Sequence, residues 1–121
     1  MAAPLANWAN NIVFNPERYE RPTSVAELQE IVTTSSHVRV LGSGHSFNEI
    51  ADSPATMLSI ARLPQSVAIN RERSTVTLTA GLRYAQLTDT LQGEGFALHN
   101  LGSLPHISVA GACATGTHGS G

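Results

Sequence analysis

The chain has 121 residues, of which 41% are apolar and 13% charged, and its formal net charge is −2. This length is enough for one domain with a core and too short for two domains of ordinary size. The charge balance gives no basis for binding nucleic acid or an anionic membrane surface. All seven cationic residues are arginine, so a P-loop lysine and a lysine Schiff base are both excluded.

Cysteine usage and the first residues bear on the cellular compartment. Cys113 is the single cysteine, so an internal disulfide is excluded and a reducing compartment is favoured. The first eight residues lack the basic start and apolar run of a signal peptide. No stretch reaches the length of a membrane span. We therefore expect a cytoplasmic protein with no membrane partner.

The first half of the chain alternates short apolar runs with turn signals. Residues 1–22 predict a brief strand or an extended arm between turns. Ser24 and Glu27 have the spacing of a capping box, and the apolar pattern that follows predicts a helix over 24–35. Strands are expected over 38–41 and 57–60.

The second half begins with a charged turn between two short β patterns. Residues 67–70 and 75–80 predict a hairpin. Tyr84, Leu87 and Leu91 have helical spacing, and the helix should end at Gly93 or Gly95. This order of elements predicts an α+β fold in two small α/β lobes, residues 1–65 and 66–121.

The last stretch differs in kind, because residues 95–121 contain no Asp, Glu, Lys or Arg. A solvated loop of this length normally carries charge. We therefore expect the stretch to be buried against a partner that accepts many hydrogen bonds from backbone and hydroxyl groups. A large polar cofactor, or the rest of a larger protein, would serve.

A glycine loop follows the strand expected at 38–41, with the sequence Val40-Leu-Gly-Ser-Gly-His-Ser-Phe47. A Gly-x-Gly turn exposes backbone N–H groups that suit a phosphate or pyrophosphate. His45 within it could contact a ligand or bond to it covalently. The alternative is a loop that only reverses the strand. A Rossmann nicotinamide site is rejected, because Phe47 replaces the third glycine and no strong helix follows.

Metal and thiol chemistry are both poorly supported. The histidines His45, His99, His106 and His118 are widely spaced, with no neighbouring carboxylate or second cysteine, so no metal site is predicted. Cys113 has no cation near it in sequence to lower its pKa, and we expect a small buried apolar residue.

Two long motifs together resemble the FAD-binding domain of the vanillyl-alcohol-oxidase superfamily. They are Val40–Ile50 and Leu101–Gly121, and shorter matches occur at Asn7–Asn11 and Arg83–Leu87. Within the superfamily the chain is most similar to the alditol (xylitol or sorbitol) oxidases, and next to the sugar-lactone oxidases. Either glycine cluster alone would be a weak signal, whereas both in order are specific.

The resemblance implies FAD as cofactor and assigns roles to individual residues. His45 matches the histidine bonded to the flavin 8α-methyl group, and Ser103 matches a position beside the flavin that contacts the polyol. The implied cofactor-binding residues are Val40, Leu41, Gly42, Ser43, Gly44, His45, Ser46, Ser103, Ser108, Gly111, Thr115, Gly116, Thr117 and His118. Cys113 stands where relatives often have other small residues.

The implied reaction is oxidation of a primary alcohol of a polyol by oxygen, giving an aldehyde and hydrogen peroxide. No convincing catalytic residue lies in this chain, because its carboxylates fall outside the uncharged stretch. In the resembling family the substrate-activating residues belong to a C-terminal part. We therefore expect an incomplete FAD-binding domain, inactive or nearly so alone. A sugar-lactone oxidase domain and a non-catalytic nucleotide- or phosphate-binding module remain alternatives.

Overall fold

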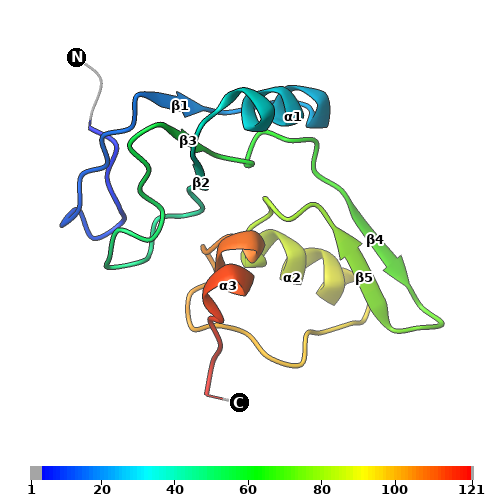
Figure 1. Ribbon diagram of the computed structural model, residues 1–121. Coiled ribbons are helices and arrows are strands. Elements are labelled where there is room, and N and C mark those ends of the chain that lie inside the picture. Colours follow the sequence, from blue (N-terminus) through cyan, green and yellow to red (C-terminus); the bar gives the residue numbers. More distant parts are fainter. Residues whose placement is uncertain (1–3, 121) are drawn as a thin grey trace. The chain divides into compact units, whose positions relative to one another are not determined.

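The computed structural model describes residues 4–120, which divide into two compact units, one ending at Leu63 and one beginning at Pro64. The first unit contains β1, α1, β2 and β3, and the second contains β4, β5, α2 and α3 (Figure 1). Within the described part of the chain, no helix has the length and apolar character needed to cross a membrane. Gly121, the last residue of the second motif, lies outside the described residues.

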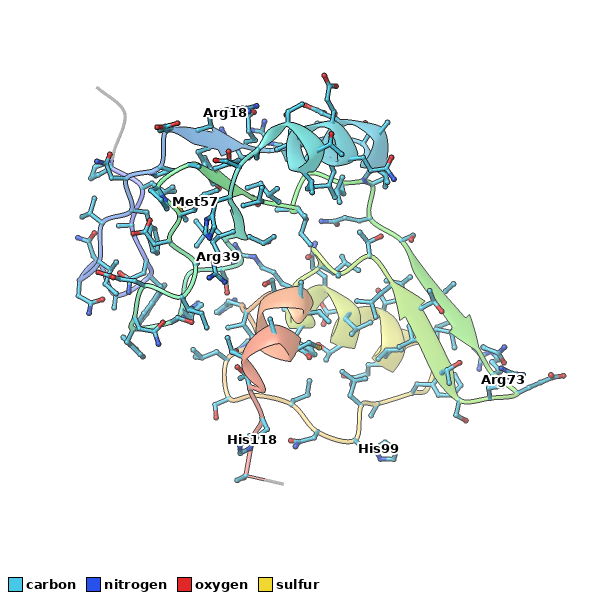
Figure 2. The ribbon with its side chains drawn as sticks, in the orientation of Figure 1. Arg18, Arg39, Met57, Arg73, His99 and His118 are labelled. Carbon is cyan, nitrogen blue, oxygen red and sulfur yellow. The ribbon has the colours of Figure 1, made fainter. Side chains whose placement is uncertain are left out.

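The first unit is built on a small parallel sheet. Its strands are β1 (Arg18–Glu20), β2 (Val38–Val40) and β3 (Thr56–Leu58), in the order β1-β3-β2. All three residues of the central strand β3 are buried, and Met57, which Figure 2 labels, is completely inaccessible. The strand expected at 57–60 is observed at 56–58, so it begins one residue earlier and ends two residues earlier. β1 was not predicted, because its polar sequence lacks a β pattern.

Helix α1 (Val25–Thr34) confirms the predicted helix. The Ser24 hydroxyl caps it by accepting a hydrogen bond from the Glu27 N–H at 3.2 Å. The Glu27 carboxylate accepts from the Thr23 N–H at 2.9 Å, one residue before the partner that a standard capping box uses. The helix buries Ile31 and leaves most of its other side chains exposed.

Residues 5–14 form an extended excursion that folds back on itself, here called the N-terminal arm. The Phe14 N–H donates to the Leu5 carbonyl at 2.7 Å, and the Asn7 N–H donates to the Ile12 carbonyl at 3.1 Å. This pairing confirms the predicted arm. The arm is attached to the sheet by a small hydrophobic cluster, whose buried members are Phe14, Leu41 and Met57.

The second unit begins with a β-hairpin. Strands β4 (Val67–Asn70) and β5 (Thr75–Leu78) pair antiparallel, with Val67 opposite Leu78. The predicted hairpin is confirmed, although its second strand is two residues shorter than expected. Side chains along both strands alternate between exposed and half-buried, and in β5 this follows the alternation of Thr75, Val76, Thr77 and Leu78 in the sequence.

Helices α2 (Tyr84–Gly93) and α3 (Val109–Thr115) each donate their first N–H group to the segment that precedes the other helix. The Tyr84 N–H donates to the Ile107 carbonyl at 3.1 Å, and the Val109 N–H donates to the Leu82 carbonyl at 2.9 Å. Helix α2 confirms the predicted helix. Helix α3 was not predicted, because its Ala, Gly and Thr residues lack an apolar stripe. The buried hydrophobic residues of this unit are Leu82, Leu87, Leu91, Ile107 and Ala112.

Candidate cofactor-binding loops

The glycine loop starts at the carboxyl end of β2. The Leu41 N–H donates to the Leu58 carbonyl at 2.8 Å, which continues the sheet pairing one residue beyond the strand. Leu41 points into the core, whereas the neighbouring Val40 is 48% exposed. The carboxyl ends of parallel strands are where open α/β sheets bind ligands. The loop therefore leaves a rigid strand at a position suited to a cofactor.

Gly44 brings the loop against the N-terminal arm. Its φ of +74° lies in the left-handed region, and a Cβ atom at this position would stand 3.4 Å from the Trp8 nitrogen. The Trp8 N–H donates to the Gly44 carbonyl at 2.6 Å. Among residues 4–120, the N–H groups of Gly42 and Ser43 donate no hydrogen bond. These two N–H groups are suited to a phosphate.

Asn7 holds the far end of the loop. Its side-chain nitrogen donates to the Ser46 carbonyl at 2.8 Å and to the Asn11 side chain at 2.7 Å. Its side-chain oxygen accepts from the N–H groups of Asn11 and Ile12, both at 3.1 Å. Only 4% of Asn7 is exposed. One buried amide therefore connects the turn of the arm to the glycine loop.

His45 lies half-buried in the loop and stacks on Trp8. The two ring centroids are 5.0 Å apart and the planes meet at 25°. Trp8 itself is 66% exposed. Sequence reasoning gave Asn7 and Trp8 no role, although both lie in a matching motif. The match of Asn7–Asn11 to the family was the available signal in the sequence.

The uncharged stretch is mostly exposed in this chain, so residues 4–120 do not themselves provide the burial expected for it. Its two ends meet: the Gly119 N–H donates to the Asn100 side-chain oxygen at 3.3 Å. A Cβ atom at Gly102 would stand 3.3 Å from the Thr117 methyl group. The structure thus brings the segment leading to Ser103 beside the segment containing Thr117 and His118.

Ser108 caps helix α3. Its hydroxyl accepts from the Gly111 N–H at 3.2 Å, and the residue is only 8% exposed. The Ala110 N–H donates to the Ala80 carbonyl at 2.9 Å. The first N–H groups of α3 are therefore already used within the unit. Ser108 and Gly111 shape the start of the helix, and their contact with a cofactor stays a prediction.

The end of α3 presents a short run of neutral polar groups. Gly116 ends the helix with a φ of +64°, and the Thr117 N–H donates to the Ala112 carbonyl at 2.9 Å. The hydroxyls of Thr115 and Thr117 lie 2.9 Å apart. His118 follows in the exposed segment after the helix, where its Nδ1 lies 2.7 Å from the Gly119 carbonyl (Figure 2). The hydroxyls of Thr115 and Thr117 therefore lie side by side, and the contact of Thr115, Thr117 and His118 with a cofactor stays a prediction.

Cys113 differs from the sequence prediction, because the thiol is exposed rather than buried. It lies beside the Tyr84 hydroxyl on the preceding helix. Burial, followed by the neighbouring Cys113 thiol, raises the pKa of Tyr84 above its ordinary value. The prediction failed because the exposed side of α3 cannot be read from a stretch of uniformly small residues. No group of three or more His, Cys, Asp or Glu residues in positions 4–120 could hold a metal ion.

Each of the two regions, taken by itself, has donor groups that suit a large polar cofactor. The glycine loop offers backbone N–H groups and an imidazole, and residues 95–120 offer hydroxyl and amide groups without charge. Glycines allow close backbone approach, and neutral donors suit a large cofactor. These features, on two mixed α/β units, define a cofactor-binding domain of the α+β class.

Residues 16–121 match the family model of the FAD binding domain, so the chain belongs to this family of vanillyl-alcohol-oxidase type. FAD is accordingly the cofactor of the domain. The chain is 43% identical over 124 residues to an alditol oxidase from Streptomyces sp., covering 100% of this chain and 30% of that relative. It is 34% identical to an L-gulonolactone oxidase from Mus musculus, covering 95% of this chain and 27% of the relative.

The fold also has a counterpart among solved structures. A cholesterol oxidase from B. sterolicum superimposes with a TM-score of 0.82 at 18% identity, covering 95% of this chain and 24% of that chain. This likeness concerns the fold alone. The chain therefore spans about 30% or less of the length of these relatives. It matches one part of each of these longer proteins.

Proposed function

We propose that the chain is the FAD-binding part of an alditol oxidase-like flavoenzyme, with the flavin bonded covalently to His45. The observation that carries this proposal is the position of His45, in a glycine loop that leaves the carboxyl end of β2, a strand paired in parallel with the buried strand β3. The identity of 43% to an alditol oxidase over the whole chain supports the choice of substrate class. The enzyme would oxidise a primary alcohol of a polyol to an aldehyde, with oxygen reduced to hydrogen peroxide.

Each region contributes a distinct part of this function. The N–H groups of Gly42 and Ser43 would donate to the pyrophosphate, and His45 would anchor the isoalloxazine end. The hydroxyls of Thr115 and Thr117 would hydrogen-bond to the cofactor, and Ser103 would contact the polyol. When bound, FAD accepts a hydride from the alcohol carbon and passes the electrons to oxygen. The substrate partner is therefore a small polyol.

The two units are proposed as two lobes of one FAD-binding domain, divided near residue 65. The remaining parts of the substrate pocket would come from a C-terminal part of the same enzyme, because the relatives are much longer than this chain. No carboxylate lies within residues 95–120 to take the hydroxyl proton of the substrate. We place the catalytic base in the C-terminal part of the enzyme.

A sugar-lactone oxidase is the second candidate function. The identity of 34% to L-gulonolactone oxidase over 95% of the chain favours it. The two candidate functions share FAD and the histidine loop, and they differ in the substrate that is oxidised. Peroxide formation by the full-length protein with xylitol or sorbitol, compared with L-gulono-1,4-lactone, distinguishes them. A preference for the lactone would replace the first candidate by the second.

The covalent anchor is tested by acid precipitation of the full-length holoprotein. Flavin should remain with the protein pellet in the wild type and move to the supernatant in His45→Ala. His99→Ala is the matched control, since His99 is exposed and lies outside the proposed site, and its flavin should stay in the pellet. Flavin in the wild-type supernatant would refute the linkage to His45 and leave the FAD assignment intact.

A further inference from the structure

The N-terminal arm contacts the glycine loop at three consecutive positions. The Trp8 N–H donates to the Gly44 carbonyl at 2.6 Å, and the Asn7 side chain donates to the Ser46 carbonyl at 2.8 Å. Between these two hydrogen bonds, the indole of Trp8 stacks on the imidazole of His45 at 5.0 Å. Asn7 and Trp8 thus hydrogen-bond to the backbone on each side of His45, and Trp8 also covers one face of the imidazole ring.

The position of Trp8 is unusual for an aromatic side chain with no active role. Trp8 is 66% exposed, so burial of its side chain contributes little free energy. The N–H group of its indole ring donates to no described residue. Asn7, by contrast, is buried with its side-chain nitrogen and oxygen both hydrogen-bonded. The arm is therefore anchored by Asn7, and this anchor holds the exposed Trp8 ring against the imidazole.

We propose that Trp8 is a positioning residue for His45, holding the imidazole in the orientation from which it bonds to the flavin. This inference rests on the proposed function. In the linkage, a ring nitrogen of His45 joins the carbon of the flavin 8α-methyl group. The ring nitrogen and the methyl group each lose one hydrogen, and molecular oxygen takes both to give hydrogen peroxide.

The physical basis is conformational entropy. A histidine in a glycine-flanked loop has rotatable side-chain bonds and a mobile backbone, and ordering them in the transition state costs rate. The two hydrogen bonds from the arm fix the backbone of Gly44 and Ser46, and the Trp8 ring excludes imidazole orientations on one side. Trp8 therefore acts through His45 and does not itself contact the reacting atoms.

The first test measures covalent flavin incorporation after FAD is added to the full-length apoprotein. Trp8→Ala should link flavin at least about tenfold more slowly, which corresponds to about 1.4 kcal/mol of activation free energy. Trp8→Phe keeps a stacking ring and should stay within about threefold of the wild type. Val13→Ala is the matched control, because it removes an exposed apolar side chain from the same arm. Its linkage rate should be unchanged.

A second readout needs no flavin. Diethyl pyrocarbonate acylates uncharged imidazole, and peptide mapping follows the modification at His45 alone. Loss of the stacked indole in Trp8→Ala should raise the acylation rate of His45 several-fold, whereas Trp8→Phe and Val13→Ala should leave it near the wild-type value. An unchanged acylation rate in Trp8→Ala would show that the ring does not hold the imidazole and would overturn the proposal.

The two proposals fail in different ways. If Trp8→Ala links flavin at the wild-type rate while His45→Ala links none, the covalent anchor is correct and the positioning role is wrong. The same conclusion follows if Trp8→Phe is as slow as Trp8→Ala. If wild-type protein binds FAD but never links it, the covalent part of the proposed function is wrong. The positioning role is then wrong as well, even if the acylation rates show that the Trp8 ring stacks on His45.

Discussion

The glycine loop and the uncharged stretch use glycine and hydroxyl residues for opposite purposes. In the loop, the contacts come from the N-terminal arm, where Asn7 and Trp8 hold the backbone around His45. The N–H groups of Gly42 and Ser43 have no acceptor among residues 4–120. In the uncharged stretch, the first N–H groups of α3 are bonded within the unit. The loop therefore offers backbone donors and one nucleophile, whereas the stretch offers mainly side-chain hydroxyls.

The largest expected effect concerns the attachment of the loop to the core. Leu41→Ala removes a side chain packed with Phe14 and Met57, and should lower the free energy of unfolding by about 2–5 kcal/mol. Val40→Ala changes the exposed neighbouring side chain and should cost less than about 0.5 kcal/mol. Urea denaturation of both variants measures the difference. Equal losses would show that the loop is not supported by the core.

Gly119 tests how closely the two ends of the uncharged stretch pack. A Cβ atom here would stand 2.1 Å from the Leu101 carbonyl oxygen, so Gly119→Ala must push the ends apart at a cost of about 1–3 kcal/mol. Faster amide hydrogen exchange at residue 119 would report the separation. Gly93→Ala is the control, because its Cβ meets nothing within 4 Å and helical alanine is favoured by about 0.5–1 kcal/mol. Protection of residue 119 after substitution would contradict the packing.

Gly44→Ala examines the contact between the loop and the arm. The positive φ costs alanine about 1–2 kcal/mol, and the added Cβ would stand 3.4 Å from the Trp8 backbone nitrogen. Gly95→Ala has the same kind of backbone strain at φ +82° but meets nothing within 4 Å. Thermal unfolding should show similar destabilisation in both variants, while flavin linkage should fall only in Gly44→Ala. Loss of linkage in Gly95→Ala as well would remove the specific role of the contact.

Ser108→Ala separates capping from cofactor binding in the second unit. Loss of the cap should cost about 1 kcal/mol, as at Ser24, whose hydroxyl caps α1 with the same 3.2 Å hydrogen bond. Calorimetric titration of apoprotein with FAD measures the second role. If Ser108 acts only as a cap, FAD affinity should fall no more in Ser108→Ala than in Ser24→Ala. A clearly greater loss in Ser108→Ala would assign it a direct contact.

The smallest effect should be seen at alkaline pH. Burial, and then the neighbouring Cys113, raises the pKa of Tyr84 in the folded state above its ordinary value of 10.0. The contribution of Tyr84 to the free energy of unfolding is therefore fully present below pH 10.0. It is lost as the pH rises through the higher pKa of the folded state. Tyr84→Phe should remove this alkaline loss, and Cys113→Ala should reduce it. Ultraviolet titration of the phenol measures the pKa directly, and an unshifted value would contradict the contact.

Much of the fold was predictable because its elements carry local signals. Ser24 and Glu27 marked the start of α1, and alternating residues marked the strand after Arg73. Helix α3 and strand β1 were missed because neither has a periodic apolar pattern. Their conformations depend on hydrogen bonds to distant residues, such as Val109 to Leu82, and on pairing with β3. Local sequence contains no record of those partners.

The candidate site divides in the same way. The sequence by itself determined the glycine loop, the uncharged stretch and membership of an FAD-binding family, because these depend on residue types in order along the chain. Only the tertiary structure decided that Asn7 and Trp8 lie against Gly44, His45 and Ser46, and that the Cys113 thiol is exposed. The physical reason is that contacts across more than thirty residues depend on how the backbone folds back, and the short arm shows no local signal for that path.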